Sequence, residues 1–137
     1  MTEKGRIIII DDDESVRKGL GMVLEAMGYA VDTAKDGKEA IEKSNANFYN
    51  LALVDIRLPD MEGTKLLTSM RETDPKMVKI VLTGYPSVNN AIEAADEGAD
   101  AYMMKPVVNM DTFLNTISEH LKKQEEDRRH SKKTQKD

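Results

Sequence analysis

The feature that most constrains this chain is an apolar run, Leu51–Val54, that stops abruptly at a carboxylate, Asp55. A run without polar positions is typical of a central parallel strand that helices cover on both faces. Because burying an unpaired charge is costly, Asp55 must lie where the strand ends and the chain enters a loop. Pro59 restricts the backbone of that loop, and Gly63 permits a close approach or a positive φ. In open α/β sheets this edge binds ligands, so the sequence predicts a polar site here.

Five short apolar runs alternate with five segments of helical periodicity. Strands are expected at 6–10, 29–33, 51–54, 77–82 and 101–104. Helices are expected at about 16–27, 38–45, 63–72, 88–95 and 110–121. Strict alternation with short loops predicts an α/β fold, in which right-handed crossovers join a parallel sheet and helices cover both faces. Five methionines fall on positions expected to fill the core, namely Met22, Met27, Met70, Met103 and Met104.

Length and composition are those of one globular domain. The chain has 137 residues, and a domain at 1–121 is long enough for one sizeable core. No apolar residue follows Leu121, so 122–137 is expected not to pack and to form a frayed helix end or a linker. Ion pairs within 125–129 could extend the last helix, but only weakly. The chain has no cysteine, which excludes disulfides, thiol nucleophiles and thiolate metal sites.

The charge distribution argues against nucleic acid as a direct partner. The net charge is −5, but residues 122–137 carry seven basic against four acidic side chains. Residues 1–121 therefore carry a net charge of −8, which would repel a phosphate backbone. No apolar run approaches the ~20 residues that span a membrane, and the segment 1–5 is no signal peptide. A cytoplasmic protein with no membrane partner is expected.

Polar side chains follow the ends of four predicted strands: Asp11 with Asp12, then Asp55, Thr83 and Lys105. Parallel strands place these ends at one edge of the sheet. Clustered carboxylates stay ionised only beside a cation, and oxygen ligands favour a hard ion such as Mg²⁺. A divalent cation, an ammonium and a hydroxyl are the groups that stabilise a phosphoryl group, and a carboxylate can attack it. The pattern therefore predicts formation of an aspartyl phosphate.

Four motifs resemble the receiver domain of two-component response regulators. They are IIIIDDDE at 7–14, DIRLPDMEG at 55–63, LTGY at 82–85 and YMMKP at 102–106. The resemblance spans about residues 6–121, with the motifs in the family's order and spacing. It implies a flavodoxin-like, doubly wound sheet of five parallel strands in the order 2-1-3-4-5, with five helices. It also implies a phosphoprotein of phosphorelay signal transduction rather than an enzyme acting on external substrates.

The resemblance also assigns roles to individual residues. Asp55 matches the phosphoacceptor, and Thr83 and Lys105 match the hydroxyl and ammonium that contact the phosphoryl group. The ligands implied for Mg²⁺ or Mn²⁺ are Asp12 directly, Asp11 largely through water, Asp55, and the backbone carbonyl of Arg57. The Lys105–Pro106 peptide bond is expected to be cis. Tyr102 matches the aromatic side chain that moves inward when Thr83 moves. Arg57 and Tyr85 occupy offsets that commonly tune the lifetime of the phosphate.

The implied partners are a sensor histidine kinase and either an output domain or a downstream protein. The phosphate-sensitive face is expected on the helix near 88–95, the strand 101–104 and the last helix, which could also form a homodimer. One alternative is a haloacid-dehalogenase-like aspartyl phosphohydrolase. That family needs a second Asp two residues after the nucleophile, where this chain has Arg57. The other is a docking module that no longer accepts phosphate, but such chains typically lose one of the site residues, and all are present here.

Overall fold

The computed structural model describes residues 4–136, with side chains described for 4–130. Residues 1–3 of the predicted start and Asp137 of the predicted tail lie outside the described residues. Five strands form one parallel sheet: β1 (Arg6–Ile10), β2 (Ala30–Ala34), β3 (Leu51–Val54), β4 (Val78–Thr83) and β5 (Ala101–Met104). The helices are α1 (Glu14–Ala26), α2 (Gly37–Ala46), α3 (Gly63–Ser69), α4 (Val88–Asp96) and α5 (Met110–Lys136).

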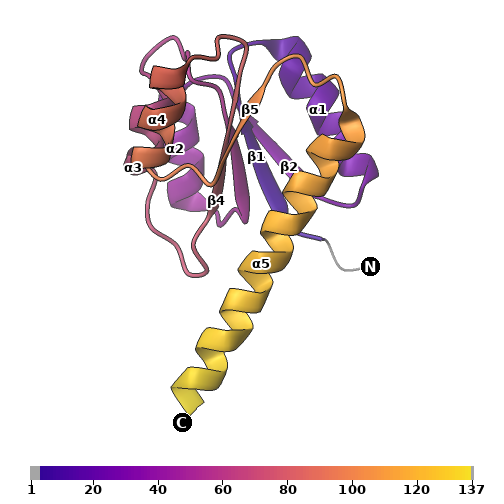
Figure 1. The fold of residues 1–137 in the computed structure, drawn as a ribbon, viewed down its shortest axis with the longest axis vertical. Helices are drawn as coiled ribbons and strands as arrows, with labels where there is room; N and C mark the ends of the chain where they lie inside the picture. Colours follow the sequence, from indigo (N-terminus) through magenta and orange to yellow (C-terminus); the bar gives the residue numbers. More distant parts are fainter. Residues whose placement is uncertain (1–3, 137) are drawn as a thin grey trace.

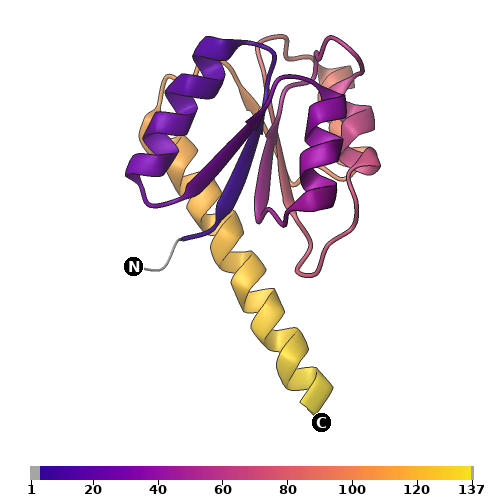
Figure 2. The same cartoon turned by 180° about the vertical axis from the view of Figure 1, so that it is seen from behind.

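The strand order is β2-β1-β3-β4-β5, which confirms the predicted topology. Helices α2, α3 and α4 cover one face of the sheet, while α1 and α5 cover the other (Figures 1 and 2). The fully apolar runs follow from this arrangement. In β1, Ile8 and Ile10 join the core beneath α2 and α3, and Ile7 and Ile9 join the core beneath α1 and α5. Every residue of Ile7–Ile10 and Leu51–Val54 is therefore buried.

Strand register brings the predicted site residues together. Ile10 pairs with Val54, and Val54 pairs with Val81, so β1, β3 and β4 end at nearly the same level. The amide of Asp55 donates to the carbonyl of Ile10 at 2.9 Å, which carries the pairing past both strands. The amide of Lys105 likewise donates to the carbonyl of Thr83 at 2.8 Å. Four strand ends thus meet at one edge of the sheet.

Two local predictions are wrong. Helix α3 ends at Ser69 rather than near residue 72, because Met70 adopts an extended backbone and buries its side chain in the core. Met22 and Met104 are 72% and 63% exposed, and Met27 is also exposed, so these three methionines do not fill the core. Helix α1 directs Leu20, Gly21 and Leu24 inward instead. The helical spacing of apolar residues did not distinguish the inward-facing positions of α1 from the exposed positions beside them.

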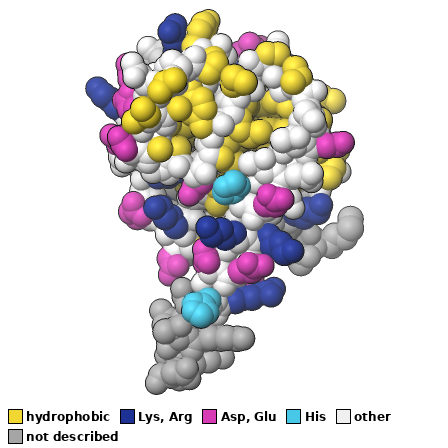
Figure 3. Space-filling model, viewed as in Figure 1, with side chains coloured by type: hydrophobic (Ala, Val, Ile, Leu, Met, Phe, Trp, Pro, Cys, Tyr) yellow, Lys and Arg dark blue, Asp and Glu magenta, His cyan; other side chains and the backbone are white. Residues whose placement is uncertain are grey.

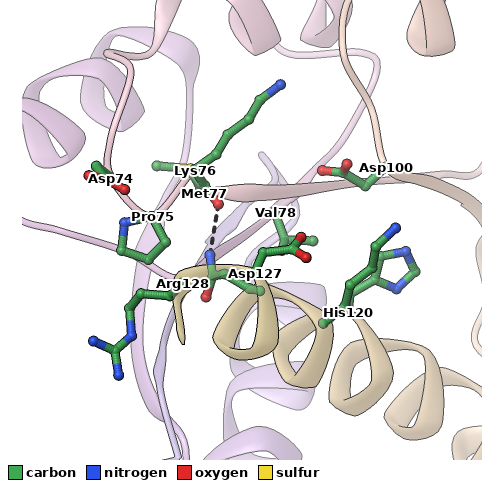
Figure 4. A pocket seen from close by; sticks show the side chains of 11 residues that line it. Asp74, Pro75, Lys76, Met77, Val78, Asp100, His120, Asp127 and Arg128 are labelled. Carbon is green, nitrogen blue, oxygen red and sulfur yellow. Dashed lines mark hydrogen bonds between the residues drawn. The ribbon is translucent and has the colours of Figure 1, made fainter. Parts of the chain in front are cut away.

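The prediction that nothing after Leu121 packs is also wrong. Helix α5 continues to Lys136 and projects beyond the sheet (Figure 1). Gln124 is only 8% exposed, and its amide is fully used: Oε1 accepts from Asn50 at 3.1 Å, and Nε2 donates to the carbonyls of Asn50 and Lys76 at 3.0 and 2.8 Å. A polar side chain thus anchors the helix without any apolar residue. Figure 4 shows the pocket of about 320 Å³ beside this anchor, with the bond to Lys76 dashed.

The helical extension that ion pairs were expected to support is present. Glu125 accepts from Arg128 at 2.6 Å and from Arg129 at 3.2 Å. Such exposed pairs contribute only a few tenths of a kcal/mol each. We therefore attribute the attachment of the extension to the domain mainly to Gln124. None of the helices in the described part of the chain is both long and apolar enough to cross a membrane.

Gln124→Ala is expected to loosen α5 beyond Leu121. The substitution removes three hydrogen bonds and leaves the carbonyl of Lys76 without this donor, a loss of about 1–3 kcal/mol. Amide hydrogen exchange of residues 122–130 should accelerate by on the order of tenfold, because local opening becomes easier. Glu126→Ala, at an exposed position of the same helix, is the control. Equal exchange rates in the two variants would show that Gln124 is not the anchor.

Candidate functional site

The two acidic residues after β1 have different environments. Asp11 is buried, with Oδ1 accepting from the Asp13 amide at 2.9 Å and Oδ2 from Lys105 Nζ at 2.7 Å. Asp12 is exposed. Arg17 in α1 donates to the backbone carbonyl of Asp11 at 2.8 Å, which holds the chain as it leaves the strand. This contact of Arg17 could not be predicted from the sequence, because its acceptor is a backbone atom.

Asp55 lies beside Asp11 and is 6% exposed. Its Oδ1 accepts from the Arg57 amide at 3.4 Å, and its Oδ2 lies 3.4 Å from Lys105 Nζ. Lys105 therefore bridges the carboxylates that follow β1 and β3. Burial raises the pKa of Asp55 above its ordinary value, and the charge of Asp11 raises it further, against the opposing effect of Lys105. For Lys105, burial lowers the pKa, but the hydrogen bond and charge of Asp11 and the charge of Asp55 outweigh it, so the net shift is upward.

Asp55→Asn is expected to raise the free energy of unfolding of the metal-free protein at pH 7. Folding raises the pKa of Asp55 above 3.8, so the folded state binds this proton more tightly than the unfolded chain does. The free energy of unfolding therefore falls as the pH rises between the unfolded and folded pKa values, and the full cost is present above that interval. Asparagine is uncharged, so it does not carry this cost of burying an ionised carboxylate beside Asp11. Urea unfolding in EDTA should show the advantage at pH 7 and its loss toward pH 3.8.

The carboxylates suit a divalent cation. One oxygen from each of Asp11, Asp12 and Asp55 lies within 4.8 Å of the others, and no other such cluster occurs among residues with described side chains. Among the residues with described side chains, Lys105 is the only cation that forms an ion pair with these carboxylates, and it pairs with Asp11 and Asp55, so the cluster has an excess of negative charge. All three donors are hard oxygens, which favour Mg²⁺ or Mn²⁺. The proposed contribution of the Arg57 carbonyl stays a prediction, but its residue lies beside the cluster, since its amide donates to Asp55.

Thr83 and Tyr102 are the two residues that were predicted to move when the site is phosphorylated. Thr83 is fully buried, and its Oγ1 accepts from the Tyr85 amide at 3.0 Å. Tyr102 is half-buried against the core cluster that contains Ala94, and its hydroxyl accepts from the Ser87 amide at 3.4 Å. The Lys105–Pro106 bond is cis, as predicted, and Asp74–Pro75 is cis as well. The Asp55 carboxylate, the Thr83 hydroxyl and the Lys105 ammonium thus lie at the ends of three neighbouring strands.

This geometry agrees with comparisons to known proteins. The family model for the response regulator receiver domain matches residues 7–118. The chain belongs to this family. A receiver domain protein (CheY-like) from Methanospirillum hungatei JF-1 superposes with a TM-score of 0.84 and 45% identity, covering 89% of this chain and 97% of that one. The likeness confirms the flavodoxin-like fold.

Curated relatives and a second solved structure extend the comparison. The transcriptional regulatory protein ZraR of Klebsiella oxytoca is 35% identical over 119 residues, which are 87% of this chain and 27% of that protein. YkoG of Bacillus subtilis, an uncharacterized transcriptional regulatory protein, is 35% identical over 76% of this chain and 46% of its own length. The chain thus spans less than half the length of these relatives. A response regulator from Burkholderia pseudomallei with a phosphorylated aspartic acid, calcium ion and citrate is 33% identical, with a TM-score of 0.71, over 80% of this chain and 64% of that one.

The two residues predicted to tune phosphate lifetime contact each other in this receiver. The Arg57 guanidinium lies 4.2 Å from the centroid of the Tyr85 ring, which is within the range of a cation–π contact. Both side chains are exposed, and each belongs to a loop that leaves the site, Arg57 after β3 and Tyr85 after β4. That they flank the phosphoryl site and affect its lifetime stays a prediction.

Gly63 closes the loop after Asp55, as the sequence indicated. Its amide donates to the carbonyl of Ile56 at 2.7 Å, and a Cβ at this position would lie 2.1 Å from the carbonyl oxygen of Asp55. Close approach, and not a positive φ, is therefore the reason for glycine. Asp60 in the same loop was not predicted to have a role. Its carboxylate accepts hydrogen bonds from the amides of Gly37 and Lys38 in α2, which are 23 and 22 residues away in the sequence. Local sequence patterns cannot reveal contacts at this separation.

Proposed function

We propose that Asp55 accepts a phosphoryl group from the phosphohistidine of a sensor kinase, in the presence of Mg²⁺ or Mn²⁺. The observation that carries this proposal is the Lys105 ammonium, which lies 2.7 Å from Asp11 and 3.4 Å from Asp55. It is the only cation that pairs with the cluster of Asp11, Asp12 and Asp55 among the residues whose side chains the structure describes. Such a site is matched to a divalent cation and an incoming phosphoryl group. The Burkholderia pseudomallei relative, which holds a phosphorylated aspartic acid and a calcium ion, supports this chemistry.

In the proposed reaction, a carboxylate oxygen of Asp55 attacks phosphorus, and the bond from phosphorus to the kinase imidazole breaks. Lys105 can hold a phosphoryl oxygen, because its ammonium already lies at hydrogen-bonding distance from the attacking carboxylate. The carboxylates of Asp11 and Asp12 would hold the cation, which would supply further neutralisation of phosphoryl charge.

We infer that the signal leaves through α4, β5 and α5. Turning Thr83 toward the phosphate would break the hydrogen bond that its hydroxyl accepts from the Tyr85 amide, and would vacate space beside it. Tyr102 can enter that space if its hydroxyl gives up the hydrogen bond from the Ser87 amide. Exposed apolar side chains gather nearby: Val88 and Ile92 on α4, Met104 at the end of β5, and Val108 before α5. Figure 3 shows hydrophobic side chains over the upper part of this face, with charged ones along the lower part of α5. A downstream protein, an output domain or a second copy would bind this surface.

The competing functions find less support. A phosphohydrolase would need an acid–base carboxyl two residues after Asp55, and the guanidinium of Arg57 stacks on Tyr85 there instead. A docking module without phosphorylation would not need the buried Asp11–Lys105–Asp55 arrangement. We further propose that residues 1–121 form the receiver and that 122–137 are a polar basic tail or linker, which α5 enters as far as Lys136.

Incubation with acetyl phosphate and Mg²⁺ should add one phosphoryl group to the protein, detectable by intact mass. The adduct should be absent in Asp55→Asn, because the amide oxygen is a poor nucleophile. Asp13→Asn is the matched control, since Asp13 lies at the same edge but caps α1, a role that asparagine can fill. EDTA should abolish the adduct in the wild type. An adduct that persists in Asp55→Asn would refute the assignment.

A further inference from the structure

The amino-terminal end of α2 is bound by two carboxylates from different parts of the chain. Asp60 Oδ1 accepts from the Gly37 amide and Oδ2 from the Lys38 amide, both at 2.9 Å. Asp36 Oδ1 accepts from the Glu39 amide at 2.8 Å, and the Asp36 carbonyl accepts from Ala40 at 3.1 Å. The Ala40 bond is the first one within the helix, so the N–H groups of Gly37, Lys38 and Glu39, which have no partner inside the helix, are all bound by carboxylates. Two of these three bonds come from the loop that follows Asp55.

A second contact holds the same loop on α2. Met61 packs against Gly37 so closely that a Cβ at that glycine would lie 2.5 Å from the Met61 sulfur. Gly37 is buried, so the loop and the helix start exclude water from this contact. The bonds from the Gly37 and Lys38 amides also lower the pKa of Asp60, which shows that they favour its ionised form.

The other side of the loop is joined to the site. The Gly63 amide donates to the Ile56 carbonyl, and Arg57 and Glu62 form an isolated bridge. The Arg57 amide donates to Asp55 Oδ1 at 3.4 Å. Residues 56–62 thus connect the acceptor carboxylate, at one side, to the first turn of α2, at the other. A displacement of the loop would move the Arg57 backbone relative to Asp55.

We propose that Asp60 is a positioning residue for the cation and phosphoryl site, acting by holding the loop 56–62 on α2. This inference rests on the proposed function, because it concerns affinity for the divalent cation. Asp60 is not a ligand in this account, since both its oxygens bind α2 amides. The coupling must be reciprocal: if the loop position set by Asp60 favours the cation, the cation must favour the bonds of Asp60 to Gly37 and Lys38.

Asp36 provides a matched control. It caps the same helix with a comparable hydrogen bond, but its side chain bonds within its own helix turn and not to the loop. Asp60→Ala and Asp36→Ala each remove a capping carboxylate from α2. A role confined to helix stability predicts the same consequences for both. A positioning role predicts that only Asp60→Ala reaches the cation site.

Calorimetric Mg²⁺ titration and amide hydrogen exchange together test the inference. Asp60→Ala should bind Mg²⁺ about tenfold more weakly than wild type, as expected when a group that orients ligands is lost. Asp36→Ala should stay within about twofold of wild type. Asp60→Asn, which keeps one acceptor oxygen, should lie between. In wild type, Mg²⁺ should slow exchange of the Gly37 and Lys38 amides, and this protection should be lost in Asp60→Ala.

Equal Mg²⁺ affinity in Asp60→Ala and Asp36→Ala, or unchanged Mg²⁺ protection of α2 in Asp60→Ala, would overturn the inference. Asp12→Ala separates this result from a failure of the proposed function. Mg²⁺ binding that is weakened by Asp12→Ala places the cation at the carboxylate cluster, whatever Asp60 does. A Mg²⁺ affinity equal to that of wild type in all three variants, Asp12→Ala, Asp60→Ala and Asp36→Ala, would overturn both proposals.

Discussion

Gly63→Ala is expected to destabilise the protein by about 3 kcal/mol, the upper end of the usual cost of overpacking. The added Cβ would lie 2.1 Å from the carbonyl oxygen of Asp55 and 2.9 Å from both the Asp55 carbonyl carbon and the Cα of Ile56. These are backbone atoms, so no side-chain rotation can relieve the overlap. The loop must separate from the end of β3, and the 2.7 Å bond from the Gly63 amide to Ile56 must break. Asp55, the proposed phosphoacceptor, would be displaced with it.

Gly19→Ala is the matched control. Gly19 lies within α1, and no atom outside its own helix would lie within 4 Å of a Cβ there. Alanine should therefore stabilise the helix by up to about 1 kcal/mol. Urea unfolding of both variants measures the two effects with opposite signs. A midpoint for Gly63→Ala equal to that of wild type would mean that the loop adapts at no cost.

The predictable part of this molecule is the part that rests on local pattern and strand geometry. An apolar run such as Ile7–Ile10 has side chains on both faces of its strand, so all of them are buried only if helices cover both faces. The structure shows this arrangement. Parallel pairing then requires the residues after the strands to share an edge. Asp11, Asp55 and Lys105 were predicted to converge on this ground alone, and they are joined by hydrogen bonds. Motif resemblance added their individual roles.

What the sequence did not reveal depends on contacts between distant polar groups. Gln124 follows an apolar stripe and looks like an exposed residue, but its amide meets carbonyls 74 and 48 residues away. Asp60 looks like a solvated loop residue, but it binds amides of α2. Hydrophobic periodicity contains no information about such pairs, because a polar side chain is buried only where partners happen to be supplied. Met22 shows the converse, an apolar side chain that remains 72% exposed.

The aromatic–cation contact between Arg57 and Tyr85 bears on how long the phosphorylated state lasts. Loss of the acyl phosphate requires water to attack phosphorus in line with the carboxylate oxygen of Asp55. We propose that these two side chains flank that approach, since Arg57 follows Asp55 by two residues and Tyr85 follows Thr83 by two. Stacking at 4.2 Å restrains both, with a contribution of about 0.5–1 kcal/mol at an exposed position. The guanidinium can also hold a phosphoryl oxygen in the ground state.

Replacing both side chains, Arg57→Ala with Tyr85→Ala, is expected to accelerate loss of phosphate about tenfold. A charge-assisted hydrogen bond contributes about 1.5–3 kcal/mol, and 1.36 kcal/mol corresponds to a factor of ten in rate. Mg²⁺ affinity should change little, because the cation is proposed to bind Arg57 only through its carbonyl. Decay is followed by intact mass after removal of acetyl phosphate. Lys4→Ala, which disrupts a separate cation–π contact with Tyr29 at the opposite edge of the sheet, should decay like wild type. Decay of the double variant at the wild-type rate or slower would show that Arg57 and Tyr85 do not shield the phosphate.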